Sequence, residues 1–250
     1  MNFIIGKNPS IEAIKTGRKI DTLFVKNSDV DEKIRYIISL AKDNKITVKN
    51  VDRKKLDSLA NGENHQGVVL AVADYKYYDF DKLLKDIKLN KESGKRSTVV
   101  ILDKIEDVHN LGSIVRSCDG AGVDAVIIQK TNAAQVNSIV EKTSSGATSY
   151  VKIVRITNIT NAIKKLKDSG MWIYALDMGE KSYYQEDLSG DVVLVIGAEG
   201  KGVSRLVKEN CDFTISIPML GKVNSLNAGI AAAIVIYDVV RQREIKNEKD

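Results

Sequence analysis

Six short runs rich in apolar residues are the feature that most constrains the fold of this chain. They occupy 98–102, 125–128, 151–156, 172–176, 192–196 and 213–217. Segments with helical spacing lie between most of them, at 111–120, 134–144, 158–168 and 203–209, and a long helix is expected from about 226 to 243. Continuous apolar strands are buried on both faces, as in a parallel sheet covered by helices. This pattern predicts an α/β domain.

The N-terminal part repeats the alternation on a smaller scale. A helix is expected at 8–16, with Asn8 as its N-cap and Pro9 in its first turn. Then follow a strand at 21–26, a helix at 30–43, a strand at 46–51, a helix at 52–60 and a strand at 67–73. Residues 1–73 are therefore expected to form a second, smaller α/β domain.

A charged segment separates the two parts. Twelve of the 25 residues in 74–98 are charged, and the segment ends in small polar residues. Such a composition is typical of a linker, although 80–87 also has the apolar spacing of a short helix. We place a charged linker at 74–96 and the second domain at 97–250.

The positive charge is concentrated before the second domain. Residues 1–96 hold 20 Lys and Arg against 14 Asp and Glu, whereas residues 97–250 hold 18 against 19. A basic module joined to a near-neutral one indicates that one part binds a polyanion and the other carries out chemistry. The alternative is that the surplus is only a solvated surface.

Composition excludes several other classes of protein. With 43% hydrophobic and 28% charged residues, the chain is neither disordered nor collagen-like. Two cysteines, Cys118 and Cys211, form no disulfide scaffold and suggest a reducing compartment. The uncharged stretch at 223–237 has 15 residues, too few to span a membrane, and no signal peptide is visible. We expect a cytoplasmic protein, with neither a membrane nor DNA as its partner.

Common catalytic signatures are absent from the sequence. It has no Gly-x-Gly-x-x-Gly after a first strand, no Walker A motif and no Gly-x-Ser-x-Gly elbow. The two histidines, His65 and His109, lie far apart, and no set of residues has the spacing of metal ligands. No metal is therefore expected.

Three stretches stand out, each at the end of a predicted strand, where open α/β sheets bind their ligands. The first holds Asn110, which is placed to begin a helix, and Arg116, which could clamp a phosphate. The second, 196–202, has three glycines around Glu199, so that a ligand could approach the backbone. The third offers Ser225 and Asn227 at the start of an alanine-rich helix. Each stretch also has a purely structural alternative. The first could be a helix cap with a surface arginine, the second a flexible turn, and the third the capped start of a core helix.

Taken together and in this order, the stretches resemble the SpoU family of RNA ribose 2′-O-methyltransferases, in the SPOUT class. The first family motif matches Asn110, Gly112 and Arg116. The second, Gly-x-Glu-Gly-x-Gly, matches 197–202, and the third, Ile-Pro-Met-x-Gly-x-x-x-Ser-Leu-Asn, matches 217–227. The segments 6–13 and 65–68 are similar to the substrate-binding domain of bacterial large-subunit (23S) rRNA guanosine-2′-O-methyltransferases.

The resemblance implies a fold, a cofactor and an assembly. Family members carry a trefoil knot in the catalytic domain, form homodimers through that domain, and use S-adenosyl-L-methionine as methyl donor. Its adenosine end contacts backbone at the positions of Gly197, Ile217 and Leu226, and we assign Gly202 and Met219 to the same cofactor site. The chain departs from the family in having Val108 where a proline is common and Gly229 where a serine is usual.

The resemblance also implies catalytic roles. Arg116 is expected to grip the target phosphate and to stabilise the developing alkoxide, because a guanidinium is not deprotonated in proteins. Asn110, Ser225 and Asn227 are expected to orient the ribose and its phosphate. The proton could leave to Glu199, to the phosphate or to water.

The expected activity is methylation of a guanosine ribose in 23S rRNA, with 23S rRNA or the pre-ribosomal large subunit as partner. Within the family, the alternatives are a tRNA ribose methyltransferase and an rRNA methyltransferase that confers antibiotic resistance. Outside it, the alternative is a non-catalytic RNA-binding protein of ribosome assembly. Five intact polar site positions argue against that alternative, because a binding module need not keep them.

Overall fold

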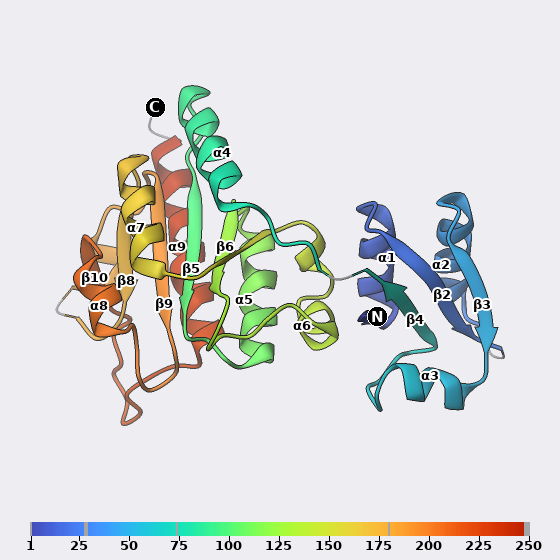
Figure 1. Ribbon diagram of the computed structural model, residues 1–250. Coiled ribbons are helices and arrows are strands. Elements are labelled where there is room, and N and C mark those ends of the chain that lie inside the picture. Colours follow the sequence, from blue (N-terminus) through green and yellow to red (C-terminus); the bar gives the residue numbers. More distant parts are fainter. Residues whose placement is uncertain (1, 28–29, 74, 180, 248–250) are drawn as a thin grey trace. The chain divides into compact units, whose positions relative to one another are not determined.

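The computed structural model describes residues 2–27, 30–73, 75–179 and 181–247 and contains two compact units (Figure 1). The N-terminal unit comprises Met1–Lys76 and Val136–Tyr150, and the C-terminal unit comprises Tyr77–Gln135 and Val151–Asp250. Asp74, at which the expected linker begins, and the last three residues of the chain lie outside the described residues. The segment 136–150 therefore belongs to a unit whose other residues lie at least 60 positions earlier in the sequence.

The N-terminal unit is built on a mixed four-stranded sheet with the order β1-β4-β2-β3. β4 runs antiparallel to both of its neighbours, and β2 runs parallel to β3. The strands are β1 (Asn2–Ile5), β2 (Ile20–Lys26), β3 (Thr47–Val51) and β4 (Val68–Val72). Three of them match predicted strands, whereas β1 is a finding of the structure.

Helices cover both faces of this sheet. Side chains of α1 (Lys7–Lys15) and α2 (Glu32–Asp43) pack on one face, and those of α3 (Arg53–Leu59) pack on the other. In the inserted segment, α6 (Ser138–Thr143) contacts β1 and η1 (Ala147–Ser149) contacts α1. The helix expected from 8 begins one residue earlier: Gly6 is its N-cap, so the prediction that Asn8 caps it is wrong.

The C-terminal unit has the parallel six-stranded sheet that the apolar runs predict, with the order β10-β8-β9-β5-β6-β7. All six predicted strands form. They are β5 (Thr98–Asp103), β6 (Ala125–Gln129), β7 (Lys152–Ile156), β8 (Trp172–Leu176), β9 (Val192–Gly197) and β10 (Phe213–Ile215). The expected α/β class, with a small α/β domain before a parallel-sheet domain, is confirmed.

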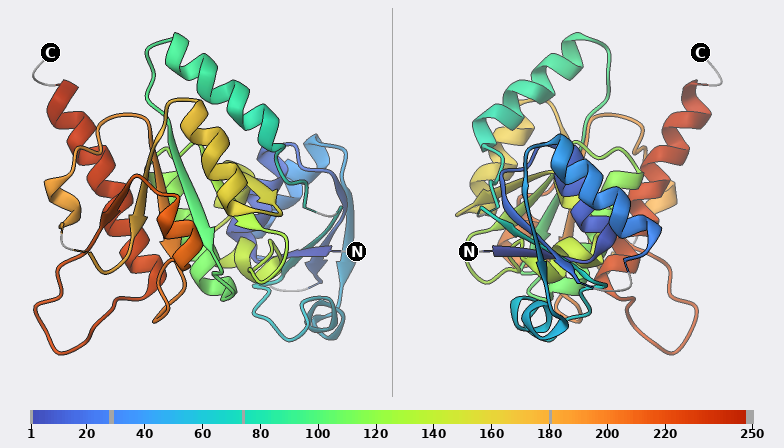
Figure 2. Two further views of the ribbon diagram at one scale, coloured as in Figure 1. Left: turned by 60° about the vertical axis from the view of Figure 1, so that its left-hand side comes forward. Right: turned by 90° about the vertical axis from the view of Figure 1, so that its right-hand side faces the viewer.

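This sheet is also covered on both sides (Figures 1 and 2). One face packs against α4 (Phe80–Glu92), α7 (Ile159–Asp168) and α8 (Arg205–Glu209). On the other side, α5 (Val108–Gly120) contacts β6 and α9 (Ala228–Asn247) contacts β9. A short η2 turn (Tyr183–Gln185) lies in the connection between β8 and β9.

The segment expected to be a linker contains an ordered helix. α4 occupies most of 74–96, and its Leu83 and Ile87 are buried in the core of the C-terminal unit. These two side chains are four residues apart and share one helix face, while lysines fill the solvent side. The high charge density of the segment therefore belongs to the exposed face of an amphipathic helix.

Strand pairing sets the position of the candidate site. β5 and β9 are neighbours, and in their register Asp103 pairs with Gly197 at the carboxyl ends of the two strands. The segments that follow these strands contain Asn110 and Glu199. Because the strands are parallel, the first two sequence motifs start side by side at one edge of the sheet.

Candidate active site

The first motif is fixed by a helix cap one turn earlier than expected. Asp107 is the N-cap of α5, and its Oδ1 accepts a hydrogen bond from the backbone N–H of Asn110 at 2.7 Å. The prediction that Asn110 begins the helix is wrong, because Val108 and His109 are already helical. The side chain of Asn110 is consequently free of capping and is available for the site.

Asn110, Glu199 and Asn227, one residue from each motif, form a single hydrogen-bonded cluster. Glu199 Oε1 accepts from Asn110 Nδ2 at 2.9 Å and from Asn227 Nδ2 at 2.6 Å. Asn227 Nδ2 also donates to Asn110 Oδ1 at 2.8 Å. A third donor reaches Glu199 Oε1, the backbone N–H of Ala228 at 3.2 Å. The structure therefore brings together three of the five expected catalytic residues.

The second motif is a tight turn that has no room for a side chain at its first residue. A Cβ on Gly197 would lie 2.0 Å from the carbonyl carbon of Gly202. The turn closes through a 2.9 Å bond from Gly202 N–H to the carbonyl of Ala198. Gly202 itself has φ +64°, a backbone conformation that favours glycine. The glycine spacing of this motif is thus explained by backbone packing within the turn.

The third motif is a long exposed segment between β10 and α9. Asn227 ends it, and Asn227 Oδ1 accepts from the N–H groups of Gly229 at 3.0 Å and Ile230 at 3.3 Å. Asn227 therefore serves as the cap of α9, which begins at Ala228 and not near Ser225 as expected. Its side chain both caps this helix and joins the cluster with Glu199.

The remaining expected residues lie along these segments and form no hydrogen bond to the cluster within the described part of the chain. Ser225 is exposed, and Ile217 and Leu226 are half-buried at the two ends of the third motif. Met219 is 36% exposed on the same segment. Arg116, on α5, is exposed and forms no hydrogen bond or ion pair within the described part of the chain. Its guanidinium is thus available to a ligand.

Two carboxylates that sequence reasoning missed hold the glycine turn. Asp103 is only 1% exposed, and it accepts from the Ser204 N–H at 2.7 Å, just after the turn. Asp177 lies against Gly202, where an added Cβ would sit 2.7 Å from its Oδ1, and its Oδ2 accepts from Lys208 at 3.1 Å. An aspartate that ends a wholly apolar strand was the available signal for Asp103.

The two helices next to the site, α5 and α9, pack closely against each other. A Cβ on Gly229 would lie 3.0 Å from Ser113 Oγ, and one on Gly120 would lie 2.7 Å from Tyr237 Oη. Position 113 of α5 lies beside 229 of α9, and position 120 lies beside 237. Because the residue numbers rise together, the two helices run in the same direction. The glycine that replaces a family serine at position 229 thus faces α5.

Among the described residues, no group of three or more His, Cys, Asp and Glu is placed to bind a metal ion, and none of the helices could serve as a membrane span. Burial raises the pKa of the Cys211 thiol to about 12 and that of Cys118 further still. Both thiols are therefore protonated near neutral pH and are poor nucleophiles.

Comparison with known proteins identifies the family. The model of the SpoU rRNA methylase family matches residues 97–237, more than half of the chain. The chain belongs to this family. A second family model, RNA 2′-O ribose methyltransferase substrate binding, matches residues 3–78. The catalytic motifs and the N-terminal unit are thus matched by separate models of one kind of enzyme.

Staphylococcal relatives match nearly the whole chain. A protein of Staphylococcus saprophyticus, assigned to the TrmH family of tRNA/rRNA methyltransferases, is 43% identical over 98% of both chains. One from Staphylococcus aureus with the same assignment is 45% identical over 96% of both chains. The similarity to these relatives therefore extends over both units of the chain.

Solved structures share the fold. The SpoU methyltransferase AviRb from Streptomyces viridochromogenes has a TM-score of 0.80 at 23% identity, covering 98% of this chain and 90% of that one. A structure of AviRb in complex with the cofactor AdoMet has a TM-score of 0.77 at 24% identity, covering 97% and 90%. The A. aeolicus TrmH/SpoU tRNA modifying enzyme is 31% identical over 67% of this chain and 86% of its own, with a TM-score of 0.57.

Proposed function

We propose that this SpoU-family methyltransferase transfers a methyl group from S-adenosyl-L-methionine to the ribose 2′-hydroxyl of a guanosine in 23S rRNA. The observation that carries the proposal is the cluster of Asn110, Glu199 and Asn227 at the carboxyl ends of β5 and β9. The family model for substrate binding over residues 3–78 supports RNA as the substrate.

The glycine turn fits the methyl donor. Backbone packing excludes a side chain at Gly197, and the space beside Gly200 is open, so we place the donor against the backbone of this turn. S-adenosyl-L-methionine, when bound, supplies a methyl group that is already activated on a positive sulfonium. Backbone of Gly197, Ile217 and Leu226 holds its adenosine end, and Gly202 and Met219 complete this site.

Arg116 is the residue that we place on the RNA. Its side chain is exposed and has no partner among the described residues, so no internal ion pair must break before it binds a phosphate. A guanidinium offers a fork of donors that matches phosphate geometry. From that position Arg116 also stabilises negative charge on the ribose 2′-oxygen as its proton leaves.

The polar cluster orients the ribose. Glu199 Oε1 already accepts three hydrogen bonds, which fix the carboxylate and leave Oε2 without a bond among the described residues. Oε2 is thus the atom of Glu199 that is open to a ribose hydroxyl or to its proton. Asn110 and Asn227 are held by this carboxylate, and Ser225 adds a hydroxyl at the exposed side.

The N-terminal unit supplies affinity for RNA, because its residues 1–76 hold 14 Lys and Arg against 10 Asp and Glu. The C-terminal unit forms a homodimer: Ile230, Tyr237 and Ile245 are 55%, 49% and 40% exposed along one side of α9.

The polypeptide of the C-terminal unit is threaded as a trefoil knot, and the enzyme works in the cytoplasm. The return of the chain from edge strand β10 to α9, beside β9, supports the knot.

A transfer assay tests the substrate. The protein is incubated with methyl-labelled S-adenosyl-L-methionine and total RNA from cells that lack it, and the RNAs are then separated. Label on large-subunit rRNA is the expected result. Label on tRNA alone, which the 31% identity to the A. aeolicus tRNA modifying enzyme makes the second candidate, would overturn the choice of rRNA.

A further inference from the structure

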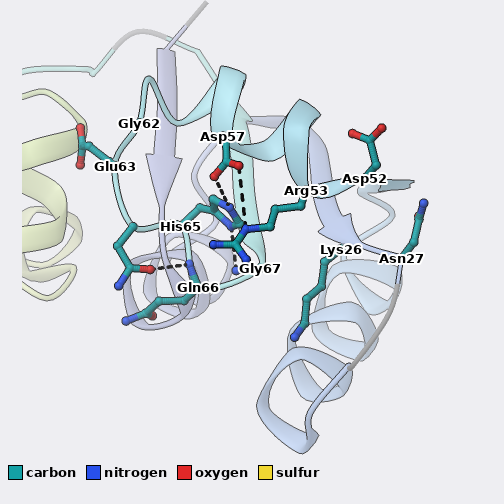
Figure 3. Close-up of a pocket in the computed structure, with 11 residues that line it drawn as sticks. Lys26, Asn27, Asp52, Arg53, Asp57, Gly62, Glu63, His65, Gln66 and Gly67 are labelled. Atoms are coloured by element: carbon teal, nitrogen blue, oxygen red, sulfur yellow. Dashed lines mark hydrogen bonds and ion pairs between the residues drawn. The ribbon is translucent and has the colours of Figure 1, made fainter.

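The N-terminal unit has a pocket of its own, far in sequence from the catalytic motifs (Figure 3). Its volume is about 680 Å³, within the range of about 300–1,000 Å³ that small-ligand sites occupy. Its walls come from the end of β2, the start of α3 and the loop at 62–67, and every lining residue is polar or glycine. Such a lining favours a polar ligand over an apolar one.

The floor of the pocket is a fixed chain of hydrogen bonds. His65 Nδ1 accepts from the Gly67 N–H at 2.8 Å, so this nitrogen carries no proton, and Nε2 donates to Asp57 at 3.1 Å (Figure 3). Gly67 has φ +85°, and a Cβ there would lie 2.9 Å from the aliphatic stem of Lys26. The loop is therefore held in one shape, with Lys26 laid across it.

The carboxylates around the pocket are already occupied. Asp52 caps α3 by accepting from the Lys55 N–H at 2.8 Å, and Asp57 bonds His65. Glu63 accepts from Ser138 at 3.2 Å and pairs with Lys142 at 3.5 Å. Each of these carboxylates therefore already has a hydrogen-bond or ion-pair partner and does not need the ligand as a donor.

The cations, in contrast, are available. The Lys26 ammonium has no hydrogen bond or ion pair among the described residues. The Arg53 side chain is 87% exposed, and its one ion pair in that part of the chain, to Asp57, is long at 3.9 Å. Both residues line the pocket, and an ammonium and a guanidinium together can bind a phosphate group.

Amide groups supply the remaining donors. Asn27 is exposed, and Asn64 and Gln66 use their side-chain oxygens to accept backbone N–H groups at 3.2 Å. The amide nitrogens of Asn64 and Gln66 form no hydrogen bond among the described residues, and both residues are exposed. Side-chain amides form paired hydrogen bonds with base edges, and proteins read RNA sequence mainly on unpaired bases.

We propose that this pocket binds one unpaired nucleotide of the RNA substrate. Lys26 and Arg53 bind its phosphate, and the amides of Asn27, Asn64 and Gln66 contact its base. The inference rests on the proposed function, since it takes the ligand of the N-terminal unit to be the RNA that the C-terminal unit methylates.

Binding of labelled, unmodified 23S rRNA transcript to the full chain tests the pocket. Lys26→Met keeps the stem over Gly67 and removes the charge, and Lys33→Met removes the same charge from an exposed position outside the pocket. We expect Lys26→Met to weaken binding about fivefold more than Lys33→Met and to lower the salt slope by about 1. Equal effects of the two variants would overturn the proposal.

Two further comparisons separate phosphate from base. Arg53→Gln should behave as Lys26→Met does, whereas Asn27→Ala should weaken binding without changing the salt slope. Single-stranded RNA should displace the transcript from the wild-type protein much better than a duplex of the same sequence. A duplex that competes equally well would contradict an unpaired nucleotide in the pocket.

The same preparations distinguish the two proposals. If the wild-type protein transfers no methyl group to any RNA, the proposed function fails, whatever the binding data show. If transfer occurs and the pocket variants bind RNA as Lys33→Met does, only the pocket proposal fails.

Discussion

The two units of this chain place their polar groups in opposite ways. In the C-terminal unit, one carboxylate and two amides bond one another at the carboxyl ends of parallel strands, and Arg116 has no partner among the described residues. In the N-terminal unit, the acids around a pocket have partners, whereas the Lys26 ammonium has none within the described part of the chain. This difference matches the two proposed roles, orientation of a reacting group by the first arrangement and binding of a polyanion by the second.

Removing the Arg116 side chain should have the largest effect on the C-terminal unit, because it should lower the rate of methyl transfer. Arg116→Ala is expected to lower the rate of methyl transfer by about 10³-fold, because it removes the charge that stabilises the forming alkoxide. S-adenosyl-L-methionine affinity, measured by calorimetry, should be unchanged. Arg205→Ala, an exposed arginine on α8, is the control and should keep the wild-type rate. A loss of cofactor affinity as large as the loss of rate would contradict this role.

Gly197→Ala tests whether the turn must stay free of side chains. The new Cβ would meet the backbone of Gly202 at 2.0 Å, so the turn must shift. Displacements of this kind cost about 10²-fold, and we expect a loss of that size in cofactor affinity. Gly190→Ala, whose Cβ meets nothing within 4 Å, is the matched control.

Thermal unfolding separates a local effect of Gly197→Ala from a failure to fold. If that variant does not fold, Gly202→Ala offers a milder test, because its Cβ would meet the Asp177 side chain. Wild-type cofactor affinity in folded Gly197→Ala would show that the turn does not bind the donor.

Salt should affect the two units differently. If about three phosphates are contacted, RNA affinity should fall about 15- to 20-fold between 50 and 200 mM salt, because counterions are released on binding. Cofactor affinity over the same range should change by less than about twofold, since the polar cluster carries no surplus of cations. Parallel salt dependence of both affinities would contradict the division of roles.

The smallest expected effect is on the pH dependence of stability and concerns α4, the helix in the segment expected to be a linker. Asp86 of α4 accepts from Lys152 of β7 and from Tyr78, both at 2.7 Å, and the Lys152 bond holds its pKa below the usual value. A lowered folded-state pKa stabilises the protein above the unfolded value of about 3.9, and this contribution is lost as the pH falls through the folded pKa.

Lys152→Met should therefore reduce the acid-side loss of unfolding free energy between about pH 5 and pH 3, by less than about 1 kcal/mol for such a half-exposed pair. Denaturant unfolding at the two pH values measures it. Lys85→Met, an exposed lysine of α4, is the control. An unchanged acid-side loss in Lys152→Met would argue that α4 is not stabilised through this bond.

Much of the fold followed from the sequence because parallel strands have an unambiguous pattern. The apolar runs predicted all six strands of the C-terminal unit. Asn110 and Glu199 each follow a predicted strand, and the structure places them in hydrogen-bond contact. The strand β1 has only four residues at the chain start, too few for a period to be recognised. It exists because β4 pairs with it, which is a long-range effect.

Local sequence patterns also could not predict which residues cap the helices or to which unit residues 136–150 belong. Asp107, Gly6 and Asn227 cap helices at positions that neighbouring polar residues could equally have taken. Residues 136–150 belong to the N-terminal unit through contacts with β1 and α1, and nothing in their composition indicates this. The buried Asp103 was visible only as a charge ending an apolar strand.

The proposed reaction is defined by the atom that receives the methyl group. After reaction with methyl-labelled S-adenosyl-L-methionine, 23S rRNA is digested to nucleosides and analysed by mass spectrometry. We expect label in 2′-O-methylguanosine alone, and none when Arg116→Ala replaces the wild-type protein. Label on a base, or on no nucleoside while the donor still binds, would contradict ribose methylation by this cluster.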